Sequence, residues 1–94
     1  MEINNVTDLN AAYGKKYPYA VALIEHFIFG YKGPDNILVA AMKGAYGRYS
    51  MYNDYPEASY FMLERECSWR EDIEEIDEWF KNQPTNGGLI KDYF

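Results

Sequence analysis

Residues 18–29, PYAVALIEHFIF, form the most apolar stretch of the chain and decide its fold. Pro18 suits the first turn of a helix, and apolar residues follow at the three-to-four-residue spacing of one helical face. These residues are Val21, Ile24, Phe27 or Ile28, and Tyr31. Because the stretch is apolar nearly all round, it predicts a central, most buried helix that Gly30 and Gly33 end. A β-strand over residues 26–31, HFIFGY, is the alternative, and the helix-favouring residues before it make it the weaker one.

Start and stop signals predict further short helices on both sides of this stretch. Thr7 is the expected cap of a first helix, which Gly14 would end. After the central helix, Pro34 and Asp35 precede apolar residues at helical spacing, which predicts another helix ending near Tyr46.

Two more helices are expected in the second half of the chain. The first has Asn53 or Asp54 as its cap and Pro56 in its first turn, and it should run to about Cys67. Ala58, Phe61, Met62 and Arg65 follow one stripe of this helix.

The last long helix starts from Ser68, with Glu71 completing a capping box. Its stripe of Ile73, Ile76 and Phe80 lies at i, i+3 and i+7. Pro84 ends it, and the tail 89–94, LIKDYF, fits either a helical turn or an extended segment. The expected fold is therefore all-α: a single small domain, 1–94, of four to five short helices.

Composition supports one soluble domain and excludes several classes of protein. Ninety-four residues suffice for one core, and a 48% hydrophobic fraction argues against disorder. A single cysteine excludes an intrachain disulfide framework. No apolar run is long enough for a bilayer span and no secretory signal is present at the start, so we expect a cytoplasmic protein.

The negative charge is concentrated in one segment. The chain has a formal net charge of −6, but residues 54–78 alone hold ten acids against two arginines, a net −8. This balance disfavours direct binding to nucleic acid or to anionic membranes. Within the segment, residues 71–78, EDIEEIDE, place six carboxylates around two isoleucines with no intervening cation. Such a run is typical of a solvated face, and it equally suits a surface that meets a basic partner, where repulsion is tolerated for complementarity.

Tyrosines recur every three residues upstream of the acidic run 71–78. They are Tyr46, Tyr49, Tyr52 and Tyr55, with Tyr60 following. Tyrosine is enriched in binding surfaces because it supplies a large contact area at low entropy cost. Core packing and an exposed interaction patch are both open at this point.

Catalytic motifs are absent from the sequence. His26 is expected to be a structural side chain, because neighbouring residues on a helix point about 100° apart and Glu25 cannot pair with it. Cys67 is expected to be a small buried residue, since nearby acids disfavour a thiolate. We therefore expect no enzyme, no cofactor and no metal site.

Residues 45–66, AYGRYSMYNDYPEASYFMLERE, carry a family resemblance. Tyr46, Gly47, Tyr49 and Ser50 resemble a Tyr/Gly turn of ArdA-like antirestriction proteins that leads into an acidic helix. The chain departs from that pattern at Tyr55-Pro56, where the family has Phe-Ala. The resemblance implies an acidic DNA mimic, carried by a phage or mobile element, that occupies the DNA site of a host restriction enzyme.

Taken together, these features predict a non-enzymatic inhibitor that binds the basic nucleic-acid-binding surface of a host defence protein, of antirestriction or anti-CRISPR type. The residues expected to contact the partner are Glu64, Glu66, Glu71, Asp72, Glu74, Glu75, Asp77, Glu78, Tyr49, Tyr52 and Tyr55. The alternative is an intracellular adaptor or regulatory protein that interacts, or forms a homodimer, through the tyrosine-rich patch.

Overall fold

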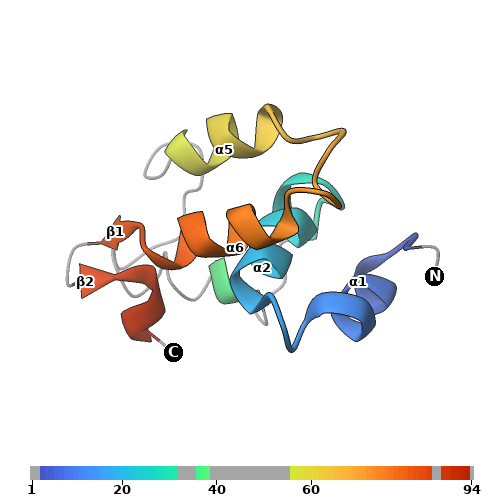
Figure 1. The fold of residues 1–94 in the computed structure, drawn as a ribbon, viewed down its shortest axis with the longest axis horizontal. Helices are drawn as coiled ribbons and strands as arrows, with labels where there is room; N and C mark the ends of the chain where they lie inside the picture. The colour runs from blue at the N-terminus through green and yellow to red at the C-terminus, as the bar shows by residue number, and fades with distance from the viewer. Residues whose placement is uncertain (1–2, 32–35, 39–55, 86–87, 94) are drawn as a thin grey trace.

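Helices make up most of the computed structural model, which describes residues 3–31, 36–38, 56–85 and 88–93 (Figure 1). Four α-helices lie within these ranges: α1 (Val6–Tyr13), α2 (Pro18–Phe27), α5 (Pro56–Leu63) and α6 (Ile73–Lys81). The all-α expectation is therefore confirmed. None of the described helices is both long and apolar enough to cross a membrane.

Helix α2 is the centre of the core, as its apolar sequence predicts. Its five residues from Ala20 to Ile24 are at most 3% exposed. It packs chiefly against α6, which crosses in front of it in Figure 1, and also against α1 and α5. The strand alternative for residues 26–31 is wrong, because the helix continues to Phe27 and the chain then turns at Gly30, whose φ of +71° favours glycine.

Helix α6 covers α2 with the predicted stripe. Ile73, Ile76 and Phe80 are all buried, and the Phe80 ring meets Tyr19 of α2 edge to face, with ring centroids 6.5 Å apart. The opposite face of α6 carries the acids. Packing of the stripe on α2 therefore fixes which way the carboxylates point.

The start of α1 differs from the expectation. Asn5, not Thr7, is its cap: Asn5 has extended backbone, and its Oδ1 accepts a hydrogen bond from the backbone N–H of Asp8 at 2.8 Å. Thr7 lies inside the helix. The helix ends at Tyr13, so Gly14 follows it directly, as predicted.

The connection between α5 and α6 is also different from the prediction. Helix α5 ends at Leu63, not near Cys67, and residues 64–72 form a series of turns. Ser68 does not cap α6; its hydroxyl donates to Asp72 Oδ2 at 2.7 Å, and the helix begins one residue after Asp72. Trp69 lies within these turns, and its buried ring meets that of Phe29 edge to face, with ring centroids 6.1 Å apart.

The C-terminal tail combines both conformations that its sequence left open. Strands β1 (Pro84–Thr85) and β2 (Gly88–Leu89) pair antiparallel over two residues each, and the 3-10 helix η1 (Ile90–Tyr93) follows. Ile90 of η1 is fully buried. This short pairing adds no layer to the helical fold.

The helix expected to end near Tyr46 lies largely outside the described residues, as do the expected caps Asn53 and Asp54. Of that helix, Ile37 and Leu38 are described and are helical. Asn36 precedes them, and its Oδ1 accepts from the backbone N–H of Leu38 at 2.8 Å.

Candidate partner-binding surface

Five carboxylates from α6 and the turn before it line one open hollow on the surface. We call this the acidic surface; its residues are Glu71, Asp72, Glu74, Glu75 and Glu78. Side chains three or four positions apart on a helix have Cβ atoms about 5–6 Å from each other. The arrangement therefore places several negative charges side by side on a rigid element.

Two cations offset part of this charge. Arg65 Nη2 lies 2.7 Å from Glu75 Oε1, and Lys81 Nζ lies 2.8 Å from Glu78 Oε2. Glu71 and Glu74 make no ion pair with any residue that the structure describes. The acidic surface thus keeps an excess of negative charge.

Arg65 is held in place by aromatic packing that the sequence did not predict. Its guanidinium lies 3.8 Å from the centroid of the Phe61 ring, and that ring stacks on Trp79 at 3.9 Å with an interplanar angle of 8°. Its Nη1 also donates to the Phe61 carbonyl oxygen, whereas its buried Nε has no hydrogen-bond partner among the residues that the structure describes. Because Arg65 is fixed between α5 and α6, it also fixes the position of Glu75.

The ion pair between Lys81 and Glu78, at the other end of the acidic surface, shifts the pKa values of both side chains. The hydrogen bond from Lys81 lowers the pKa of the Glu78 carboxyl below its ordinary value of 4.5. The same hydrogen bond raises the pKa of Lys81 above 10.5. Both side chains are at the surface, so the pair keeps Glu78 ionised to lower pH without anchoring the fold.

Asp77 does not lie with the other acids on the acidic surface, and its contact with a partner stays a prediction. Only 8% of the residue is exposed. Its Oδ1 accepts from the backbone N–H groups of Tyr19 and Ala20 at 2.9 and 3.0 Å, so it caps α2 from the neighbouring helix. This capping is needed because α2 has no side-chain cap of its own at Tyr17.

The remaining predicted acids lie on the turns that follow α5. Glu64 is well exposed, and its carboxylate is 3.6 Å from Arg65 Nη1. Glu66 is exposed as well, and it borders a separate apolar hollow next to Phe27 and Leu63. These two acids therefore flank the acidic surface without lining it.

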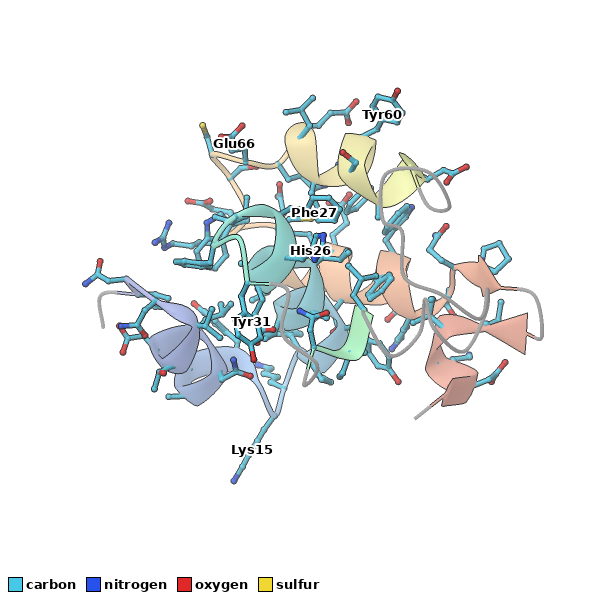
Figure 2. All side chains as sticks on the ribbon, turned by 180° about the vertical axis from the view of Figure 1, so that it is seen from behind. Lys15, His26, Phe27, Tyr31, Tyr60 and Glu66 are labelled. Carbon is cyan, nitrogen blue, oxygen red and sulfur yellow. The ribbon has the colours of Figure 1, made fainter. Side chains whose placement is uncertain are left out.

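The predicted tyrosine contacts fall mostly outside the described residues. Tyr49, Tyr52 and Tyr55 are not described. Tyr60 is 69% exposed and points away from the body of the protein in Figure 2, and Leu63, three residues later on α5, is 66% exposed. An apolar patch is thus present on the outer side of α5.

His26, the candidate base, is buried, whereas Cys67, the candidate nucleophile, is exposed. His26 is 3% exposed, and its ring meets that of Phe27 edge to face at 4.8 Å. Cys67 is exposed, so the expectation that it is buried is wrong. In the part of the chain that the structure describes, no three His, Cys, Asp or Glu side chains are grouped to hold a metal ion.

The fold and the acidic surface together are those of a small helical protein with an acidic face. Comparisons of the chain with family models, curated proteins and solved structures return no match. The resemblance of residues 45–66 to ArdA-like proteins stays a prediction.

Proposed function

We propose that this protein is a non-enzymatic inhibitor that binds the basic nucleic-acid-binding surface of a host defence protein, of antirestriction or anti-CRISPR type. The observation that carries the proposal is the acidic surface, with five carboxylates around one hollow. Glu71 and Glu74 in particular have no cationic partner within the described ranges. Carboxylates so arranged can take the place of phosphates opposite lysine and arginine.

Rigidity supports this function as much as charge does. Helix α6 is held by its buried stripe and by the stacked Phe61 and Trp79 rings, so the helix that carries the carboxylates is in place before any partner binds. Preorganised groups lose less entropy on binding than flexible ones. Repulsion among the acids destabilises the free helix by a few tenths of a kcal/mol per neighbouring pair, and a basic partner would relieve it.

Charge reversal at Glu71 and Glu74 tests the proposal. Immobilised wild-type protein and the Glu71→Lys/Glu74→Lys variant are compared for capture of DNA- or RNA-binding proteins from lysate of the cells that harbour the gene. We expect the double variant to lose at least tenfold in apparent affinity. Capture by wild type should also weaken between 0.1 and 1 M salt, where the Debye length falls from about 10 to 3 Å.

A matched control separates a specific surface from net charge. Glu57 is exposed in the first turn of α5 and does not line the acidic surface. Glu57→Lys changes the net charge by as much as Glu74→Lys does, and it should leave capture unchanged. Equal effects of the two single substitutions, or unaltered capture by the double variant, would end the proposal.

A second candidate function is an adaptor that interacts through the outer side of α5. The observation that favours it is the exposure of Tyr60 and Leu63 on the same side of that helix. Self-association through this patch should persist at high salt, because apolar contacts are not screened. Sedimentation of wild type and of Tyr60→Ser/Leu63→Ser in low and high salt distinguishes the two candidates; a monomer under all conditions counts against a homodimer.

A further inference from the structure

Glu25 is a buried acid on the central helix, and its carboxylate is held by two amides. Only 6% of the residue is exposed. Its Oε1 accepts from Asn10 Nδ2 at 2.6 Å, and its Oε2 accepts from Asn36 Nδ2 at 2.8 Å. Both carboxylate oxygens of Glu25 thus accept hydrogen bonds from side-chain amides.

No cation among the described residues pairs with this carboxylate. Lys15, at the turn between α1 and α2, extends away from the body of the protein in Figure 2. Lys16 places its Nζ 5.3 Å from the centroid of the Tyr17 ring. Buried acids are ordinarily paired with a cation or bound to a metal, and among the described residues neither counterpart lies beside Glu25.

The Asn10 and Asn36 amides orient the Glu25 carboxylate and leave its oxygens able to accept further hydrogen bonds. Asn10 Nδ2 also donates to the Val6 carbonyl oxygen at 2.9 Å, and Asn36 Nδ2 donates to that of Ala22 at 3.0 Å. Each amide is thereby tied to a backbone carbonyl. Each carboxylate oxygen has a lone pair left for a further donor. The group is therefore preorganised to accept additional N–H bonds.

A hollow of about 100 Å³ adjoins Glu25 and Asn10, between α1, α2 and Ile37. Apart from these two polar residues its wall is small or apolar: Gly14, Pro18, Val21, Ala22 and Ile37. The site thus has one negatively charged end and one apolar side. Such a lining suits a ligand that joins a cationic head to a short aliphatic stem.

We propose that this hollow binds a primary alkylammonium group, either a small free amine or the lysine side chain of another protein. One carboxylate balances one positive charge, and an ammonium supplies the N–H donors that the free lone pairs can accept. A divalent cation is the poorer match, because calcium and magnesium sites take at least six oxygen ligands and usually more than one carboxylate. This proposal is independent of the acidic surface and of the function proposed above.

Nuclear magnetic resonance of the ¹⁵N-labelled full chain tests the site directly. Titration with n-butylammonium chloride should shift the side-chain amide signals of Asn10 and Asn36 in a saturable manner. Sodium chloride at the same ionic strength and n-butanol, which has the stem without the charge, should not. Comparing n-butylammonium with Nα-acetyl-lysine amide separates the two sources: tighter binding of the former indicates a free amine, and tighter binding of the latter a lysine side chain.

A second experiment removes the negative charge of Glu25. Glu25→Gln should weaken n-butylammonium binding at least tenfold while the circular dichroism of the helices is retained. Absence of saturable shifts in the wild-type protein overturns the proposal, and so do equal shifts with n-butanol. Since the wild-type titration decides by itself, a Glu25→Gln chain that fails to fold does not leave the question open. Binding of calcium or magnesium at Glu25 in preference to the amine would likewise refute it.

Discussion

Replacing Asp77 by alanine should destabilise the protein more than any substitution on the acidic surface. Among the described residues its carboxylate caps α2, and it accepts from two backbone N–H groups, those of Tyr19 and Ala20. Pro18 at the first helical position has no N–H, so these two groups are the first donors of the helix. Alanine at 77 leaves both without an acceptor, next to the interface between α2 and α6.

The magnitude follows from the cost of losing a cap and stranding buried donors. Loss of a capping side chain typically costs about 0.5–2 kcal/mol, and a buried unsatisfied polar group about 1–3 kcal/mol. Water can reach part of the site, because Asp77 is 8% exposed, so we expect a loss of about 2–4 kcal/mol. A chain of this length has a free energy of unfolding of roughly 5–14 kcal/mol. The melting temperature should fall by roughly 10–25 °C.

Urea unfolding followed by circular dichroism measures this loss. Asp77→Asn is the matched comparison, because it keeps an acceptor oxygen but removes the charge, and it should lose about 1 kcal/mol. Glu74→Ala on the acidic surface should change stability by less than about 0.5 kcal/mol. A loss for Asp77→Ala of less than about 0.5 kcal/mol, or one equal to that of Glu74→Ala, would refute the reasoning that Asp77 caps α2.

Two further predictions concern packing and pH. Phe80 is fully buried, so Phe80→Ala should lower the free energy of unfolding in urea by about 3–5 kcal/mol. Leu63→Ala, on the exposed side of α5, should change it by no more than about 0.5 kcal/mol. Similar losses for both variants would contradict the assignment of Phe80 to the core. The lowered pKa of Glu78 means that its interaction with Lys81 is present above pH 4.5 and is lost as pH falls through the lowered pKa. An NMR titration should give a Glu78 midpoint below 4.5 that rises in Lys81→Met, and an unchanged midpoint would show that Lys81 is not its cause.

The helical periodicity in the sequence was enough to predict the two helices that form the core. Apolar residues all round α2 and the stripe of Ile73, Ile76 and Phe80 correspond directly to burial. The helix ends were harder, because several capping residues compete within a few positions. Asn5 and Thr7 can both cap, and the conformation of the preceding backbone, which the sequence does not state, decides between them.

Five of the eight acids expected to contact a partner line the acidic surface, and Glu64, Glu66 and Asp77 do not. The placement of Asp77 has a local reason. Position 77 follows Ile73 by four residues and precedes Phe80 by three, so it lies on the apolar face of α6 and not with the other acids. Counting periodicity for the acid as well as for the isoleucines would have placed it in the core. The contact of Arg65 with Phe61 and Trp79 is different, because it joins residues from two helices whose packing no local pattern specifies.

The most direct test of the central claim is competition between this protein and duplex DNA for one captured partner. The partner is bound to a fluorescently labelled duplex, and anisotropy is recorded as wild-type protein or Glu71→Lys/Glu74→Lys is added. If the acidic surface occupies the nucleic-acid-binding site, wild type should release the duplex completely and the variant should need at least tenfold more protein. A ternary complex that retains the duplex at saturating protein would contradict the account.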